Sequence, residues 1–336
     1  MRHAMNEPFR SRWGRRAVTI PTMLGATLLG LAVSPLALLV AAIFDVVRGR
    51  RGLPTARVMV FLLQYGVNDC VEIAITPVLW VLAGFGARLN APRSIRRHQR
   101  LQAWSLTVLA RRADRLLGLR MTIDDAGRAA LAPGPVIALS RHVSIIDASL
   151  PALLYQRLGF RSQGVIMAEL LADPGFDLLY GRTGSVFINR EDGPAAVASI
   201  HTMGRTVDAQ TVLIVFPEGQ LFRPERLVRS QARAIERDPR RASMISGLRH
   251  VLPPRPSGTI ALLDAVPAAD VVVIAHTGLE RFSTFAALAR SVPLREPIRV
   301  TAWRIPRAEI PTDRDARADW LDRQWARLDA WCESPR

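Results

Sequence analysis

Two residues with complementary acid–base chemistry, His142 and Asp147, follow an apolar run at residues 135–139. Short apolar runs bounded by proline and polar residues are typical of buried strands, so we expect His142 at the mouth of a strand. Positions five apart on a helix point about 140° away from each other. The two side chains can therefore meet only if His142 lies in a loop and Asp147 in the first turns of the next helix. A carboxylate on one imidazole nitrogen would then leave the other nitrogen free as a base.

Two later segments also end apolar runs with residues that could do chemistry. Residues 184–190, Gly-Ser-Val-Phe-Ile-Asn-Arg, place Arg190 after an expected strand, where a guanidinium suits a phosphate held by two parallel hydrogen bonds. Residues 215–219, Val-Phe-Pro-Glu-Gly, place Glu218 after another strand, and Gly219 permits a tight turn. Ligands of open α/β sheets bind outside the carboxyl ends of the strands, so Glu218 could accept a hydrogen bond from a substrate hydroxyl. Taken singly, each segment also fits an ordinary surface arginine or turn glutamate.

The elements that must position these residues alternate apolar runs with polar helical stretches over residues 121–310. The runs are 136–139, 164–167, 185–188, 212–216 and 271–275. This spacing predicts an α/β catalytic domain with a mixed, largely parallel sheet flanked by helices. Thr312 and Asp313 then begin a predicted amphipathic helix over residues 311–336. Its apolar side, which either docks on the domain or anchors at a lipid interface, holds Trp320, Leu321, Trp325, Leu328 and Trp331.

The N-terminal part of the chain is strongly apolar. Residues 17–44 contain no charged side chain and are long enough to cross a hydrocarbon core. Residues 58–87 form a second apolar stretch, interrupted by Asn68, Asp69 and Glu72, which fits a re-entrant or interfacial segment as well as a span. We therefore expect a membrane-associated helical hairpin over residues 1–87.

A basic amphipathic linker helix is predicted over residues 88–120, lying on the membrane or packed on the domain. Its expected apolar side consists of Trp104, Leu106, Val108, Leu109, Leu116 and Leu117. Arginines flank every boundary of the apolar stretches, and the positive-inside rule counts such residues as cytoplasmic. The sequence thus favours an inner or plasma membrane protein whose catalytic domain faces the cytoplasm.

The composition limits the choice of partners. The net charge is +16 and the sequence contains no lysine, so every cation other than histidine is arginine. This surplus predicts anionic partners. Much of it flanks the apolar stretches and no nucleic-acid module is recognised, so we expect anionic membrane lipids and no nucleic acid. Arginines of residues 223–241 could meet coenzyme A phosphates or the membrane, or form a solvated helix face. Cys70 and Cys332 lie too far apart for a disulfide scaffold or zinc site, and we expect no cofactor or metal.

In their order along the chain, the three segments resemble the glycerolipid acyltransferases, the family of 1-acylglycerol-3-phosphate and lysophospholipid acyltransferases. The family motifs are N-H-x-S-x-x-D, G-x-x-F-I-x-R and F-P-E-G. The first is matched at His142, Ser144 and Asp147, with Arg141 in place of asparagine. The second and third are matched in full at Gly184, Phe187, Ile188, Arg190, Phe216, Pro217, Glu218 and Gly219. The usual Thr-Arg-Ser after the third motif is replaced by Gln-Leu-Phe, and the strand before His276 lacks the proline of the family's fourth motif.

The resemblance implies acyl transfer from acyl-CoA or an acyl carrier protein, as co-substrate, to the free hydroxyl of a lysophospholipid, foremost 1-acylglycerol-3-phosphate. It implies that His142 is a base held by Asp147, that Arg190 binds the acceptor phosphate and that Glu218 binds its glycerol. Further substrate-binding positions carried over from the motifs are Gly184, Phe187, Pro217 and Gly219. Another lysolipid, such as lyso-ornithine lipid or a lysophospholipid undergoing remodelling, is an alternative acceptor. A catalytically silent membrane scaffold of the same fold is a further alternative.

Three smaller expectations complete the site. Ser144 is not acylated in the family, and we expect it to start a helix or form local hydrogen bonds. Backbone N–H groups near that helix start, or that of Gly219, could stabilise the developing oxyanion. His276 is interpreted as a structural histidine.

Overall fold

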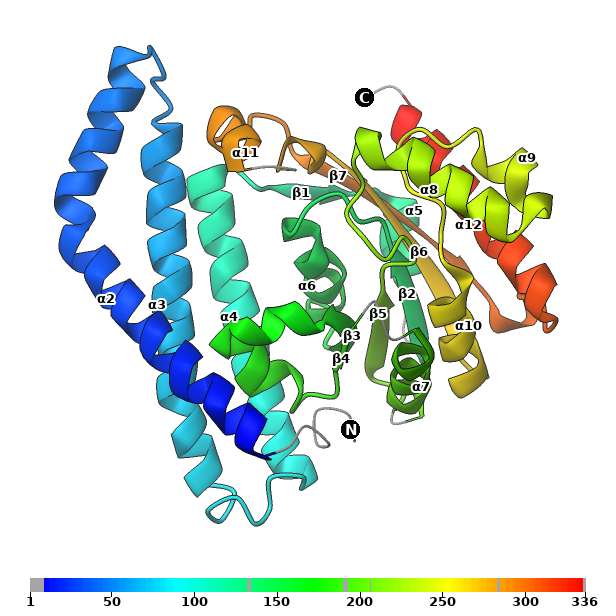
Figure 1. Cartoon of the computed structure of the whole chain (residues 1–336), viewed down its shortest axis with the longest axis horizontal. Helices are drawn as coiled ribbons and strands as arrows, with labels where there is room; N and C mark the ends of the chain where they lie inside the picture. Colours follow the sequence, from blue (N-terminus) through cyan, green and yellow to red (C-terminus); the bar gives the residue numbers. More distant parts are fainter. Residues whose placement is uncertain (1–8, 132–133, 190–192, 206, 283–284, 335–336) are drawn as a thin grey trace. The chain divides into compact units, whose positions relative to one another are not determined.

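The structure, a computed structural model, describes residues 9–131, 134–189, 193–205, 207–282 and 285–334 (Figure 1). The chain divides into two compact units, each described by itself. The first comprises Met1–Arg120, Ile166–Glu191 and Phe285–Pro297. The second comprises Met121–Val165, Asp192–Thr284 and Ile298–Arg336.

A seven-stranded sheet runs in the order β1-β7-β6-β2-β5-β3-β4. Its strands are β1 (Met121–Ile123), β2 (Val136–Ser140), β3 (Arg161–Met167), β4 (Val186–Ile188), β5 (Thr211–Val215), β6 (Asp270–Thr277) and β7 (Ile298–Ile305). β7 is antiparallel to β6 and parallel to β1, while β2 is parallel to both β5 and β6. The expected mixed, largely parallel sheet is therefore confirmed, and the five apolar runs are β2 to β6.

The centre of the sheet positions the site because the ends of three strands are in register. All five residues of β2 are buried, and Leu139 pairs with Val215 of β5 on one side and Val273 of β6 on the other. Since these strands run parallel, β2 and β5 both end at the same carboxyl end of the sheet. His142 and Glu218, which follow these two strands, are brought together at that end.

Helices cover the sheet of the second unit, with α6 on one side and α10 and α12 on the other (Figure 1). The α-helices of this unit are α5 (Asp125–Ala130), α6 (Leu150–Gln156), α7 (Gly193–Gly204), α8 (Pro224–Arg237), α9 (Ala242–Ile245), α10 (Pro256–Ala265) and α12 (Arg314–Glu333). Shorter helical turns are η1 (Ile146–Ser149), η4 (Pro239–Arg241), η5 (Glu280–Phe282) and η6 (Arg307–Glu309).

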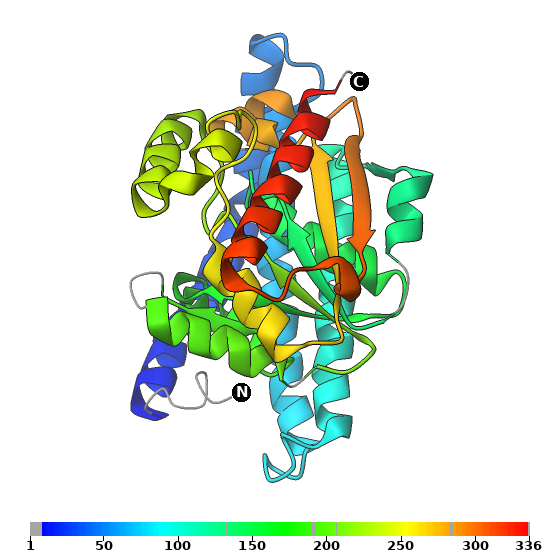
Figure 2. The same cartoon turned by 90° about the vertical axis from the view of Figure 1, so that its right-hand side faces the viewer.

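The C-terminal helix α12 docks on the domain. The side chain of Asp313 accepts a hydrogen bond from the Ala316 N–H and caps the helix, as the sequence predicts. Trp325 and Leu328 are completely buried, and the helix lies across β6 (Figure 2). The choice that the sequence left open is therefore settled in favour of docking for these side chains.

The first unit contains α2 (Phe9–Val47), α3 (Pro54–Val81) and α4 (Pro92–Leu117), with η2 (Ala168–Ala172), η3 (Phe176–Tyr180) and α11 (Phe285–Ser291). Two helices, over Ser11–Val47 and Pro54–Val81, are long and apolar enough to cross a membrane. Twenty-eight helical residues extend about 42 Å, more than the roughly 30 Å of a hydrocarbon core.

The turn between α2 and α3 is held by the buried Asp45. Its carboxylate accepts hydrogen bonds from the Thr55 N–H at 2.8 Å and the Ala56 N–H at 3.3 Å. These are N–H groups of the first turn of α3, which no residue of the helix itself can satisfy. Asp45 therefore acts as the cap that the helix lacks at Leu53.

The polar residues that interrupt the second apolar stretch face protein. The amide of Asn68 donates to Glu72 Oε1 at 3.1 Å and to Ser105 Oγ of α4 at 2.7 Å, and the Ser105 hydroxyl also donates to Glu72. Asn68, Asp69 and Glu72 are all buried. Polar groups in a membrane segment are expected to face protein in this way.

The buried face of α4 differs from the predicted one. Of the residues expected on an apolar side, Leu117 is buried, but Trp104 is 45% exposed. The buried face instead includes His98, Gln102 and Ser105. Trp104 is therefore not on the face of α4 that packs on protein, because α4 packs against a polar surface of α3, which helical periodicity alone does not reveal. Its exposure fits a helix that lies on the membrane, and that placement stays a prediction.

Close packing of α2 on α3 gives a test of the hairpin. A Cβ atom at Gly66 would lie 2.6 Å from Thr27 Oγ1, whereas one at Gly25 would have no neighbour within 4 Å. We expect Gly66→Val to destabilise the protein by about 1–3 kcal/mol through overpacking. The measurement is the midpoint of thermal inactivation in detergent, with Gly25→Ala as the neutral control. An unchanged midpoint for Gly66→Val would show that the hairpin is not packed as described.

Candidate active site

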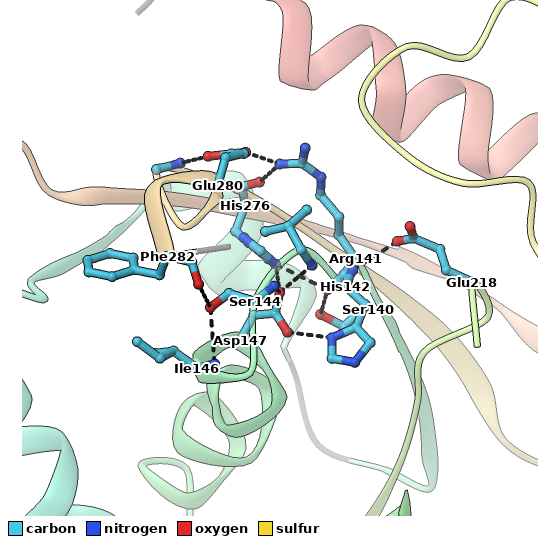
Figure 3. Close-up of polar contacts among 12 residues, drawn as sticks. Ser140, Arg141, His142, Ser144, Ile146, Asp147, Glu218, His276, Glu280 and Phe282 are labelled. Carbon is cyan, nitrogen blue, oxygen red and sulfur yellow. Dashed lines mark hydrogen bonds and ion pairs between the residues drawn. The ribbon is translucent and has the colours of Figure 1, made fainter. Parts of the chain in front are cut away.

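His142 and Asp147 are in direct contact. The imidazole Nδ1 lies 2.6 Å from Asp147 Oδ1 (Figure 3). His142 lies in the loop after β2, and Asp147 belongs to the short helix η1. The predicted arrangement, a loop histidine meeting a carboxylate of the next helix, is therefore confirmed.

The second oxygen of Asp147 holds the loop that carries the histidine. Asp147 Oδ2 accepts the N–H groups of Val143 at 2.5 Å and Ser144 at 2.7 Å. Asp147 has no exposed surface. One buried carboxylate thus orders both the backbone of the loop and the ring of His142.

The remaining face of the imidazole is partly open. Its ring packs against Phe216, with the centroids 4.4 Å apart, and the side chain of His142 is 19% exposed. With Nδ1 on the carboxylate, the neutral ring carries its proton there and has its lone pair on Nε2. Among the residues that the structure describes, no hydrogen-bond partner is seen for Nε2. This nitrogen can take a proton from an incoming hydroxyl.

Glu218 lies beside the histidine, but its contacts are with backbone. Oε1 accepts the His142 N–H at 2.8 Å and Oε2 accepts the Leu252 N–H at 2.9 Å. The residue is 1% exposed. Burial raises the pKa of Glu218 to about 8, against the opposing effect of the two backbone hydrogen bonds. Its expected contact with the acceptor glycerol stays a prediction, because both oxygens are already engaged.

Arg141, which replaces the family's asparagine, is 1% exposed, and its guanidinium contacts three groups. Its guanidinium donates to the carbonyl oxygens of His250 and His276, each at 2.7 Å, and pairs with Glu280. Burial acts to raise the pKa of Glu280, but the charge of Arg141 and the hydrogen bonds from Arg141 and from backbone N–H groups together outweigh it, and the pKa lies below its ordinary value. The substitution is accommodated because a carboxylate and two carbonyls surround the guanidinium.

His276 lies behind the carboxylate of Asp147. Its Nε2 is 3.1 Å from the Arg141 carbonyl oxygen and 3.7 Å from Asp147 Oδ2. The ring is completely buried, and this burial lowers the pKa of His276. The neutral ring donates to the carbonyl of Arg141 and packs against Asp147.

Sequence reasoning missed Glu280 and the contacts of Arg141 and His276. Glu280 lies 139 positions from Arg141, and no motif or periodicity connects the two. The only local signal was the departure from the motif at Arg141: an arginine next to a buried strand requires an acidic partner somewhere in the fold.

Three other motif residues make structural contacts with the backbone. The Ser144 hydroxyl donates to the Phe282 carbonyl and accepts the Ile146 N–H, as expected of a residue at a helix start. The Gly219 N–H donates to the Phe216 carbonyl at 2.9 Å. It is therefore engaged in its own turn, where the φ of +65° favours glycine, and is not the free oxyanion donor considered from the sequence. The Pro217 carbonyl accepts the Arg255 N–H at 2.8 Å.

The second motif belongs to the first unit. Phe187 lies in β4, and Gly184 precedes that strand with a φ of +101° that favours glycine. Arg190 lies outside the described residues. The structure thus brings His142, Asp147 and Glu218 together within the second unit, while the assignment of Gly184, Phe187 and Arg190 to the acceptor stays a prediction.

Comparison with known proteins agrees with these motifs. Residues 123–244 match the family model named acyltransferase, and this range encloses all three motifs. A search of curated proteins gave no match. Among solved structures, the chain is similar to the 1-acyl-sn-glycerophosphate acyltransferase PlsC from Thermotoga maritima, with 13% identity and a TM-score of 0.46. That likeness covers 81% of this chain and 99% of the other. The match of residues 123–244 to the acyltransferase model supports the resemblance of the three motifs, in their order along the chain, to the glycerolipid acyltransferases.

Proposed function

We propose that the protein transfers an acyl group from a thioester to the free hydroxyl of a lysophospholipid, converting 1-acylglycerol-3-phosphate to phosphatidate. The observation that carries the proposal is the 2.6 Å contact between His142 Nδ1 and Asp147 Oδ1, with Nε2 on a partly exposed ring. The match of residues 123–244 to the acyltransferase family supports the reaction class.

In the proposed mechanism His142 is the general base. Its Nε2 takes the proton of the acceptor hydroxyl as that oxygen attacks the thioester carbonyl, and Asp147 stabilises the imidazolium that forms. The tetrahedral intermediate then collapses and the carbon–sulfur bond breaks. The departing thiolate takes the proton that His142 received from the acceptor hydroxyl. The products are the ester and a free thiol, and no covalent enzyme intermediate forms.

We propose that Arg190 binds the phosphate of the acceptor, since a guanidinium can grip phosphate through two parallel hydrogen bonds. For Glu218, the two backbone contacts support a positioning role: it fixes the main chain at His142 against the segment at Leu252. We also propose that the helices α2 and α3 hold the enzyme in a membrane, with the arginine-rich ends drawn to anionic headgroups on the cytoplasmic side.

The base assignment predicts the effect of removing the imidazole. We expect His142→Ala to lower kcat for transfer from a radiolabelled acyl thioester by about 10²–10⁴-fold, the usual contribution of a positioned base. His201→Ala on α7 is the matched control and should keep the wild-type rate. If His142→Ala acylated lipids at the wild-type rate, the assignment of His142 as the base would be wrong. A wild-type protein that transfers no acyl group would indicate a catalytically silent scaffold of the same fold.

The acceptor assignment predicts a dependence on phosphate. We expect Arg190→Ala to lower kcat/KM for 1-acylglycerol-3-phosphate by roughly 10- to 100-fold, since a charge-assisted hydrogen bond contributes about 1.5–3 kcal/mol. Activity on acceptors without phosphate should not change. The measurement is acyl transfer across a panel that includes lyso-ornithine lipid. A wild-type enzyme that prefers a phosphate-free acceptor would contradict the role given to Arg190.

The positioning role of Glu218 predicts a pH-dependent stability effect. The folded protein raises the pKa of this carboxyl from 4.5 to about 8, so its contribution to stability is full below about pH 4.5 and is lost as the pH rises through about 8. Glu218→Gln leaves one backbone N–H without an acceptor and should lower the thermal midpoint. We expect the difference between the thermal midpoints of wild type and variant to decrease from pH 6 to pH 9, because the wild type loses the contribution of Glu218 over this range.

Kinetics distinguish this role from direct binding of the glycerol. A positioning role predicts that Glu218→Gln lowers kcat while the KM for the acceptor stays within about twofold. A large rise in KM with kcat unchanged, together with a stability gap that does not vary with pH, would show that Glu218 binds the acceptor instead.

A further inference from the structure

Helix α8 carries a row of arginines that the proposed mechanism does not use. They recur at spacings of three, four and four, which places them within about 80° of one another around the helix. The row consists of Arg226, Arg229, Arg233 and Arg237, and all four residues are exposed. We call this set the α8 arginine row.

The opposite side of the helix is hydrogen-bonded to the end of α9 and the segment that follows it. Gln231 Nε2 donates to the carbonyl oxygens of Ile245, Ser246 and Leu248. Gln231 lies about 160° around the helix from Arg233. The arginine row therefore lies on the exposed side of the helix, where Arg226 at its start also donates to the Leu221 carbonyl at 3.3 Å.

The row begins close to the catalytic histidine. The Phe222 N–H donates to the His142 carbonyl at 2.7 Å, and α8 begins at Pro224. Arg226 is four residues from Phe222, so its Cα lies within about 14 Å of the contact with the catalytic loop. From there the row extends about 16 Å to Arg237.

The charge of the row is not neutralised by the protein. Within the described parts of the chain, no acidic side chain forms an ion pair with its four members. By contrast, the neighbouring Arg240 pairs with Asp238 and Asp315. Glu225 and Glu236 lie along one edge of the row only. Permanently charged guanidinium groups held in a row attract an anionic partner.

The form of the row indicates which partner fits. A convex row about 16 Å long suits an extended surface better than a small ligand, whose phosphates would need a concave site. A helix that docks on a membrane carries exposed apolar side chains beside its basic residues. The large apolar side chain exposed on α8 is Val228, at 74%, and it lies about 140° from Arg233. These features favour an acidic protein surface.

We propose that the α8 arginine row is the docking surface for an acidic acyl carrier protein. The carrier would bind with acidic side chains along the row and extend its thioester-bearing arm toward His142. The inference rests on the proposed acyl transfer and selects the carrier protein over coenzyme A as the donor that this surface serves.

The test compares the two donors with the same acyl chain. We expect Arg229→Glu/Arg233→Glu to lower kcat/KM with acyl carrier protein by about tenfold or more at low salt, because charge pairs at an interface control association. The rate with acyl-CoA should stay within about twofold. Arg314→Glu/Arg323→Glu on α12 makes the same change in charge at exposed positions and is the control.

Binding is measured separately so that a failure of transfer does not obscure the result. Full-length His142→Ala protein in detergent should bind acyl carrier protein on a biosensor, and adding the α8 double substitution should abolish this binding. Unchanged binding and transfer in the α8 variant would overturn the inference. Equal losses with both donors would also overturn it, since the row would then serve a membrane or the acceptor. Binding without transfer by the wild type would instead refute the proposed function.

Discussion

The arrangement of the site depends on one buried carboxylate that accepts from three donors. Asp147 receives the imidazole Nδ1 of His142 and the N–H groups of Val143 and Ser144. Because the same group orders the loop and orients the ring, the histidine cannot turn without breaking the contacts that shape its own backbone. Such preorganisation is what a general base requires, since it must meet the acceptor hydroxyl in one geometry.

Two further buried side chains, Glu218 and Arg141, hold the loop that carries His142 against segments that are distant in the sequence. Glu218 joins the main chain at His142 to that at Leu252, and Arg141 joins the end of β2 to the carbonyls of His250 and His276. Both are nearly inaccessible to water, so leaving either without partners would be costly. The unusual Arg141 and its partner Glu280 therefore stabilise a site whose motif otherwise has an asparagine at this position.

Local patterns predicted much of the fold and of the catalytic pair. The five apolar runs are β2 to β6, Asp313 caps α12, and the spacing of His142 and Asp147 implied the loop-to-helix geometry. Pairings between distant segments were not predictable, because neither periodicity nor spacing encodes them. The short β1 and the mixed pattern of β7 gave no clear signal, and the polar face of α4 depends on Asn68 and Glu72 of another helix.

The most direct test of the account is the protonation state of the His142 ring in the wild-type enzyme. Nitrogen NMR of histidine-labelled protein in detergent, with the signals of His142 identified by their loss in His142→Ala, reports which ring nitrogen carries the proton. We expect the neutral ring to carry its proton on Nδ1, shared with Asp147, and to leave Nε2 unprotonated. A ring that carries its proton on Nε2 would lack the lone pair that the mechanism needs and would contradict the assignment of His142 as the base.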